Sequence, residues 1–139
     1  SKSVLPKIEE QMKNTLADYK SGKIKSQLIT TASGLKYIVH ETGSGAKAQP
    51  GQMVSVNYYG CLMDGAMFDN SFQRGQEFSF PLGQRQVIPG WDEGLALIPV
   101  GSKATFFIPY ALAYGEAGSP PAIPAKADLA FYIEVLDVK

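Results

Sequence analysis

The sequence is poor in the residues that carry metal and covalent chemistry. Its 139 residues include one cysteine, Cys61, and one histidine, His40. A single cysteine excludes an intrachain disulfide, and one residue of each kind cannot form an ordinary zinc site. His40 and Cys61 could pair as base and nucleophile, but each lies in a strand-like alternation, where a surface imidazole and a core thiol are commoner. We therefore expect no metal, no cofactor and no covalent catalysis.

An excess of charge and a long apolar run are also missing. The 13 basic and 13 acidic residues balance, so the chain has no electrostatic surface typical of nucleic-acid binding. No apolar run approaches the length of about 18 residues that would span a membrane. Nothing at the N-terminus resembles a signal peptide, although one could have been removed before Ser1, so composition leaves the compartment open.

The stretch over residues 86–97 holds the only tryptophan, Trp91, and its pattern predicts a short helix. Pro89 suits a first helical turn, and Asp92 and Glu93 lie near the positive end of the helix dipole. Because so short a helix is not stable alone, a surrounding sheet must hold it. Trp91 is therefore either the centre of the core or the floor of a pocket.

An amphipathic helix is predicted over residues 4–20. Its apolar residues recur at spacings of three and four: Leu5, Ile8, Met12, Leu16 and Tyr19. The apolar stripe needs a partner, which is either the rest of the chain or the helix of a second copy. Residues 30–34 read as a hinge. We therefore divide the chain into a helical arm and hinge, 1–33, and a main domain, 34–139.

From Leu35 the apolar period changes from 3.6 to two, which is typical of strands. The alternation predicts strands near residues 35–39, 54–62, 78–82, 104–108 and 129–135. Residues 67–71 are expected to lead into a polar loop that runs through Arg74 and Gly75. The predicted fold is α+β, with an antiparallel sheet of five to six strands curved around the short central helix. Residues 109–127 lack any period, and long loops of this kind are usually functional or disordered.

The aromatic residues are concentrated in the main domain. Of seven tyrosines, seven phenylalanines and one tryptophan, all except Tyr19 and Tyr37 lie between Tyr58 and Tyr132. These rings either fill the core or line a concave site, and both readings fit the composition. Tyr58 and Tyr114 favour a site, because a buried tyrosine hydroxyl needs a hydrogen-bond partner.

Several motifs together resemble the FKBP-type peptidyl-prolyl cis-trans isomerases over about residues 34–139. They are Val56-Asn57-Tyr58-Tyr59-Gly60, Gly65-Ala66-Met67-Phe68-Asp69-Asn70-Ser71, Phe80-Pro81-Leu82-Gly83, Val87-Ile88-Pro89-Gly90-Trp91-Asp92-Glu93-Gly94, Ala113-Tyr114-Gly115 and Leu129-Ala130-Phe131. The helical arm is similar to that of the bacterial secreted branch, the macrophage infectivity potentiator proteins. That likeness favours a periplasmic or secreted location.

The resemblance implies a set of site residues. Those facing the reacting amide or its proline ring are Tyr58, Phe68, Asp69, Trp91, Tyr114 and Phe131. The remaining substrate contacts are Phe78, Val87, Ile88 and Ile123. In this set Trp91 is the floor, Tyr114 and the Ile88 N–H are hydrogen-bond donors, and Ile123 belongs to the flap, the proline-rich loop over residues 109–127. Ser119 and Gln86 replace a histidine and a glutamate that are frequent in the family.

The implied activity is isomerisation of X–Pro peptide bonds in unfolded or flexible chains, without a cofactor. Implied partners are proline-containing polypeptides, macrolides of the tacrolimus and rapamycin type, and a second copy bound through the N-terminal helix. The alternative is a chaperone or adaptor module of the same fold with little catalysis. A third possibility is a structural β-domain whose aromatic core has no cavity near Trp91.

Overall fold

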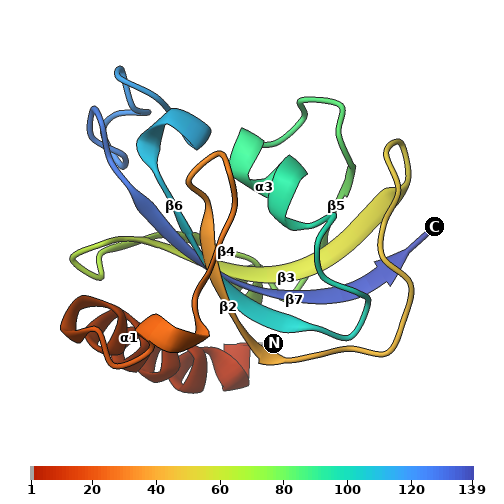
Figure 1. Cartoon of the computed structure of the whole chain (residues 1–139), viewed down its shortest axis with the longest axis horizontal. Helices are drawn as coiled ribbons and strands as arrows, with labels where there is room; N and C mark the ends of the chain where they lie inside the picture. The colour runs from red at the N-terminus through yellow and green to blue at the C-terminus, as the bar shows by residue number, and fades with distance from the viewer. Residues whose placement is uncertain (1) are drawn as a thin grey trace.

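The computed structural model describes residues 2–139, which form one antiparallel sheet with helices on both faces (Figure 1). The strands are β1 Ile29–Thr30, β2 Lys36–Glu41, β3 Met53–Leu62, β4 Met67–Asn70, β5 Phe78–Pro81, β6 Lys103–Ile108 and β7 Leu129–Val138. The α-helices are α1 Leu5–Ser21, α2 Ser71–Arg74 and α3 Pro89–Gly94. Short 3-10 helices cover Lys2–Val4, Lys25–Gln27 and Tyr110–Leu112. The strand order is β1-β2-β6-β7-β3-β4, with β5 also paired to β3.

The predicted fold class is confirmed, but the expectation of five to six strands was too low, because the sheet has seven. The two additional strands are β1, of two residues, and β4, of four. β1 is too short for an alternating pattern to stand out, and β4 has two apolar residues followed by two polar ones, so it does not alternate. β1 ends where the hinge was predicted. β4 and the single turn of α2 occupy the stretch predicted to lead into and form a polar loop.

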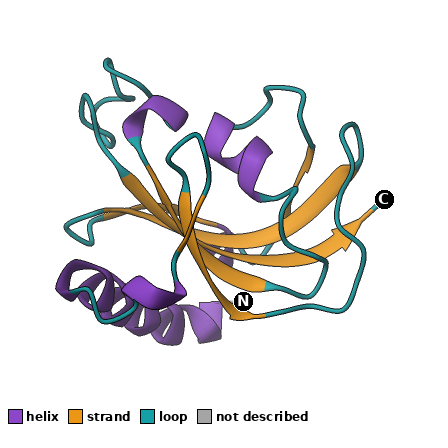
Figure 2. Ribbon diagram, in the orientation of Figure 1, coloured by secondary structure: helices purple, strands orange, loops and turns teal. Residues whose placement is uncertain are grey.

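Helix α3 lies close to the inner face of the sheet because two glycines face β6 (Figures 1 and 2). A Cβ added at Gly94 would lie 2.6 Å from the Phe106 ring, and one at Gly90 would lie 2.6 Å from the Ile108 side chain. Glycines four residues apart lie on one helix face, so both allow the same close approach. The contact holds Trp91 against the sheet.

Helix α1 covers the outer face of the sheet and forms a second core there (Figure 1). Ile8, Met12 and Leu16 are buried, and the Tyr19 ring stacks on Phe107 with 4.0 Å between ring centroids. The apolar stripe of the helix is thus satisfied within the described chain. Of the two partners that the sequence left open, the structure uses the sheet of the same chain.

His40 and Cys61 do not form a nucleophile–base arrangement. Cys61 is fully buried in the second core, and burial raises the pKa of its thiol to about 12. The thiol therefore stays protonated near neutral pH. His40 lies exposed near the end of β2, and its Nε2 is 2.7 Å from the Thr105 hydroxyl. The structure therefore favours a surface imidazole at His40 and a core thiol at Cys61.

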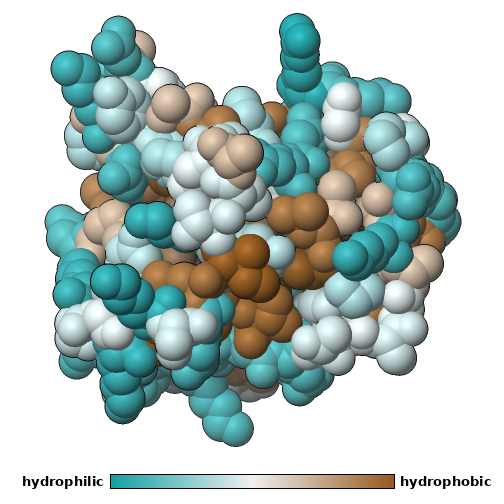
Figure 3. Space-filling view, viewed as in Figure 1, coloured by the Kyte–Doolittle hydropathy of each residue, from teal (hydrophilic) through white to brown (hydrophobic). Residues whose placement is uncertain are grey.

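The face of the molecule seen in Figure 3 is mostly hydrophilic, with apolar side chains gathered near its middle. In the described chain, six large apolar side chains are exposed: Val4, Ile29, Met53, Met67, Tyr114 and Leu136. Met53 and Leu136 lie on the paired strands β3 and β7. No helix within residues 2–139 has the length and apolar character needed to cross a membrane.

Candidate ligand-binding site

A hollow of about 250 Å³ opens between α3, the inner face of the sheet and the loop that follows β6. Its lining consists of Tyr58, Phe68, Asp69, Phe78, Gln86, Val87, Ile88, Trp91, Tyr114 and Phe131. Every residue expected at the site is present except Ile123, and Gln86 is added. A structural β-domain without a cavity near Trp91 is therefore excluded.

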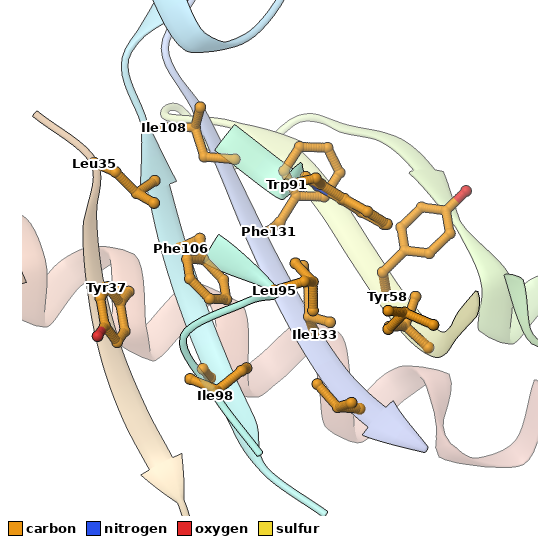
Figure 4. Close-up of a cluster of buried hydrophobic side chains, with 14 of the residues drawn as sticks. Leu35, Tyr37, Tyr58, Trp91, Leu95, Ile98, Phe106, Ile108, Phe131 and Ile133 are labelled. Atoms are coloured by element: carbon orange, nitrogen blue, oxygen red, sulfur yellow. The ribbon is translucent and has the colours of Figure 1, made fainter. Parts of the chain in front are cut away.

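Trp91 forms the floor, surrounded by rings from different strands (Figure 4). The rings of Phe131, Tyr58 and Phe78 stand nearly perpendicular to the indole, with centroids 5.3, 5.1 and 6.0 Å away. Such edge-to-face contacts fix ring orientation as well as burying area. Trp91 belongs to the main core and also lines the hollow. The sequence left open whether Trp91 is the centre of the core or the floor of a pocket, and the structure places it in both roles.

The indole N–H of Trp91 is the one buried side-chain donor in residues 2–139 that has no hydrogen-bond acceptor. Only 4% of the residue is exposed. Aromatic faces accept N–H groups only weakly, so the surrounding rings compensate little for the missing acceptor. Because this nitrogen is buried, the surface that the indole offers to the hollow is that of its ring carbons.

Gly60 permits the tight ring packing on one wall. It lies opposite Phe131 in the β3–β7 ladder. A Cβ at this position would lie 2.5 Å from the Phe131 ring and 3.0 Å from that of Phe68. Because side chains of directly opposite residues share a sheet face, any residue larger than glycine would displace Phe131 from the pocket wall.

A hydrogen-bonded group of three residues forms the polar wall. The Tyr58 hydroxyl donates to Asp69 Oδ2 at 2.5 Å. Arg74 donates to Asp69 Oδ1 at 2.7 Å and to the Tyr58 oxygen at 2.8 Å. Burial, followed by the bond to Asp69, raises the pKa of Tyr58 to about 12, against the opposing effect of Arg74. Tyr58 therefore stays a neutral phenol, and its hydroxyl hydrogen is committed to Asp69.

Arg74 is a site residue that the sequence reasoning missed. Helix α2 turns the chain back so that Arg74 returns to Asp69, five residues earlier. The signal was Asn70, whose side chain caps this helix by accepting the Gln73 N–H at 2.7 Å. Asn70 before Ser-Phe-Gln-Arg is an N-cap pattern, and recognising it would have placed Arg74 beside Asp69.

Two hydrogen-bond donors at the hollow have no partner in the described chain. The Tyr114 hydroxyl makes no bond, and 42% of that residue is exposed. Burial and the charge of Asp69 raise the pKa of Tyr114, which keeps the hydroxyl protonated. The backbone N–H of Ile88 also bonds to no protein acceptor, although the Ile88 carbonyl accepts from Trp91. Both donors are available to a ligand.

Asp92 holds the loop that carries Gln86, Val87 and Ile88. Its two carboxylate oxygens accept the backbone N–H groups of Gly83, at 2.8 Å, and Arg85, at 3.1 Å. Arg85 has a φ of 58°, a left-handed conformation that side chains rarely adopt. The hydrogen bond to Asp92 stabilises this turn, so the loop returns toward α3 in a defined position.

Ile123 lies in the core and not in the lining of the hollow. Only 4% of it is exposed, and its backbone forms a bridge with Ser119 inside the flap. The two residues exchange N–H···O=C bonds of 2.9 and 3.1 Å. Ile123 therefore anchors the flap in this structure, and any direct contact with a ligand stays a prediction.

Comparison with known proteins places these features in a family. The model of the FKBP-type peptidyl-prolyl cis-trans isomerase family matches residues 44–136. The chain belongs to the FKBP-type peptidyl-prolyl cis-trans isomerases. The ring-lined hollow over Trp91 lies within the span that this family model matches.

Of two FKBP relatives, one extends the similarity into the arm. The FKBP-type peptidyl-prolyl cis-trans isomerase FkpA of Aeromonas hydrophila is 46% identical over 95% of this chain and 48% of its own length. The peptidyl-prolyl cis-trans isomerase FPR2 of Saccharomyces cerevisiae is 50% identical over 67% of this chain and 70% of its own. This FKBP chain thus spans about half the length of its FkpA relatives.

The crystal structure of FkpA from Escherichia coli has the same fold as this FKBP chain. It superposes with a TM-score of 0.79 and 41% identity, covering 99% of this chain and 63% of the other. The likeness therefore includes α1 as well as the sheet. Within residues 2–139, no group of three or more His, Cys, Asp or Glu side chains is arranged to hold a metal ion.

Proposed function

We propose that this chain is a peptidyl-prolyl cis-trans isomerase acting on X–Pro bonds of flexible polypeptides. One observation carries the proposal. A ring-walled hollow floored by Trp91 has two unpartnered donors at its edge, the Tyr114 hydroxyl and the Ile88 N–H. That combination fits a proline ring flanked by peptide carbonyls. The names of its FKBP relatives, which are isomerases, support the same reading.

The proposed chemistry needs no proton transfer. Rotation about a peptide bond has a barrier of about 18–20 kcal/mol, which comes from amide resonance. A site that binds the twisted amide better than the planar amide lowers this barrier, and each tenfold in rate requires about 1.4 kcal/mol of such preference. Contact with the aromatic rings of the hollow displaces water from the planar, dipolar amide. Asp69 is already bonded to Tyr58 and Arg74, so it serves here as a fixed charge.

We assign the proposed roles as follows. The proline ring lies on Trp91 between Tyr58, Phe78 and Phe131. Tyr114 and the Ile88 N–H each donate to a carbonyl of the substrate. Phe68 and Asp69 face the amide that twists.

Macrolides of the tacrolimus and rapamycin type are proposed as ligands of the same hollow, because they are implied by membership of the family. Gln86 lies in the lining, and Ser119 lies in the flap. We expect these two positions to affect affinity at the rim and to leave the ring-walled floor unchanged.

We also propose a domain division, an oligomeric state and a cellular location for this chain. We keep the division into an arm, 1–33, and an isomerase domain, 34–139, although the Ser33 hydroxyl donates to Glu93 of α3 at 2.6 Å.

The described chain is proposed to be a monomer, because the apolar face of α1 is covered by its own sheet. A dimer through that face would require α1 to leave the sheet. A periplasmic or secreted location is proposed from the likeness of the arm, and fractionation of cells expressing the full-length protein tests it.

Catalysed cis–trans exchange of a proline tetrapeptide, followed by NMR, tests the activity. We expect acceleration by the wild-type chain and a clear loss with Tyr114→Phe, which removes one donor but keeps the ring. Tyr110→Phe is the matched control, since Tyr110 lies in the same loop but outside the lining. If Tyr114→Phe binds peptide normally and the wild type gives no acceleration, the chain is a binding module of the adaptor class.

A further inference from the structure

A second hollow, of about 380 Å³, adjoins the proline pocket on the side of β4 and α2. We call it the rim shelf, and its lining residues are Met67, Phe68, Asp69, Asn70, Gln73 and Arg74. Phe68 and Asp69 also line the pocket over Trp91. The two hollows therefore share a wall. A polypeptide whose X–Pro pair occupies the pocket can continue directly onto the shelf.

The shelf offers an exposed apolar contact. Met67 is 42% exposed, which makes it one of the most exposed large apolar side chains in the described chain. Its sulfur accepts a weak hydrogen bond from the Asn70 amide at 3.6 Å, and this contact orients the thioether. Methionine is flexible and polarizable, so it packs against apolar side chains of differing shape.

The polar groups of the shelf favour an uncharged ligand. The charges of Asp69 and Arg74 neutralise each other in an ion pair of 2.7 Å, so neither sign dominates. The exposed side-chain amide of Gln73 makes no hydrogen bond in the described chain, whereas its backbone N–H is used by Asn70. A free amide can both donate to and accept from a peptide backbone.

The dimensions also fit a peptide. An extended chain advances about 3.3–3.6 Å per residue, so the residues flanking a bound X–Pro pair lie only a few ångströms outside the pocket. Asn70 and Ser71 are not available to them. Asn70 caps α2, and Ser71 accepts from the Tyr58 N–H and donates to Asn57. Phe68 and Asp69 are shared with the pocket, and Arg74 is paired with Asp69, so the contacts that belong to the shelf alone are Met67 and Gln73.

We propose that the rim shelf is a second substrate subsite, which takes an apolar side chain from a residue flanking the X–Pro pair. The proposal rests on the proposed isomerase function of the adjoining pocket. Met67 is its specificity-determining contact, and Gln73 holds the substrate backbone.

The test compares tetrapeptides that carry leucine or alanine at the position before the X–Pro pair, or at the position after it. At one of these positions, wild-type kcat/KM should favour leucine by about fivefold, since the larger side chain buries more apolar area. Met67→Ala should reduce that ratio toward one while the alanine peptides keep their rate. Gln73→Ala should raise KM for leucine and alanine peptides alike. Met53→Ala is the matched control, because Met53 is 38% exposed on β3 and lines neither hollow.

The outcomes separate this proposal from the proposed function. Acceleration with a leucine-to-alanine ratio that Met67→Ala leaves unchanged at both positions overturns the shelf and leaves the isomerase standing. If acceleration is absent, the same ratio is read from peptide affinity through quenching of Trp91 fluorescence. A ratio that persists in affinity and falls in Met67→Ala supports the shelf on a binding module. Peptides that neither bind nor isomerise overturn both proposals.

Discussion

At the scale of single residues, the polar wall of the pocket is built to keep phenols neutral. Tyr58 is partly buried and donates to Asp69, and both conditions favour the protonated form. Burial and the charge of Asp69 act in the same direction on Tyr114. The two tyrosines differ in use, because the Tyr58 hydrogen is committed to Asp69 whereas that of Tyr114 is free for a ligand.

We predict that any loss of X–Pro exchange acceleration on raising the pH from about 8 has its midpoint above about pH 10. An ordinary tyrosine would be half ionised at the upper end of this range. Here the pKa of Tyr58 is raised to about 12 and that of Tyr114 lies above the ordinary value, so Tyr58 stays neutral and Tyr114 ionises later than an ordinary tyrosine. NMR exchange rates measured across the range, corrected for the uncatalysed rate, check this. A decline with a midpoint at or below pH 10 would show that one of the phenols ionises early.

At the scale of elements, α3 depends on the side chains at its first turn. Asp92 ties the preceding loop to the helix through the N–H groups of Gly83 and Arg85. Glu93 ties the segment before β2 to the same helix by accepting from Ser33. The helix, its floor residue and the Ile88 donor are thus held as one unit.

We predict that Asp92→Ala weakens peptide binding by about tenfold or more, as a rise in KM. The change leaves two backbone N–H groups without their charged acceptor, and such bonds contribute about 1.5–3 kcal/mol each. Glu93→Ala is the control, since it removes the neighbouring carboxylate and keeps the loop anchor. An Asp92→Ala protein that binds the tetrapeptide as well as wild type does would show that the loop is positioned by other contacts.

Helix α1 is predicted to stabilise the whole domain. Leu16 is only 4% exposed against the outer face of the sheet. Leu16→Ala should lower the free energy of unfolding by about 2–5 kcal/mol, the range for buried leucines. Asn14→Ala, on the exposed side of the helix, should change it by less than about 0.5 kcal/mol. Urea unfolding followed by circular dichroism and by Trp91 fluorescence measures both. If α1 were a detached arm, the two variants would be equally stable.

At the scale of the whole molecule, the sheet separates two cores. The inner core holds α3 and the pocket, and the outer core holds α1 and the fully buried Cys61. Alternate residues of the same strands serve the two faces. One set makes the ring contacts on the inner face, and the other packs against helix α1 on the outer face. Phe131 faces the pocket, whereas Ala130 and Tyr132 belong to the outer core.

We predict that the chain of residues 1–139 is a monomer of 15.0 kDa in solution. The reason is that Ile8, Met12 and Leu16 are already buried by their own sheet. Light scattering across a range of protein concentrations checks the mass. Twice that mass would favour the homodimer through the N-terminal helix, and deletion of the helix would then return the protein to single mass.

The sequence predicted the long elements and the residues of the pocket, for identifiable reasons. β3 and β7 have ten residues each, so their alternation is visible, and Trp91 is preceded by a proline and flanked by Gly90 and Gly94. It did not predict β1, which is too short to show a period, or β4, whose residues Met67-Phe68-Asp69-Asn70 do not alternate. Arg74 was missed because it is brought to its partner, Asp69, only by the single turn of helix α2 that Asn70 caps. Ile123 points into the core, and sequence order alone does not distinguish a side chain in the core from one in the pocket lining.

The central claim is that X–Pro exchange takes place on Trp91, and a single titration tests it most directly. A proline tetrapeptide is added to the protein while NMR exchange and the fluorescence of its one tryptophan are recorded on the same samples. We predict accelerated exchange and a change in Trp91 fluorescence that reach half-saturation at the same peptide concentration. Acceleration with an unperturbed Trp91, or saturation of Trp91 by peptide with no acceleration, would contradict the account.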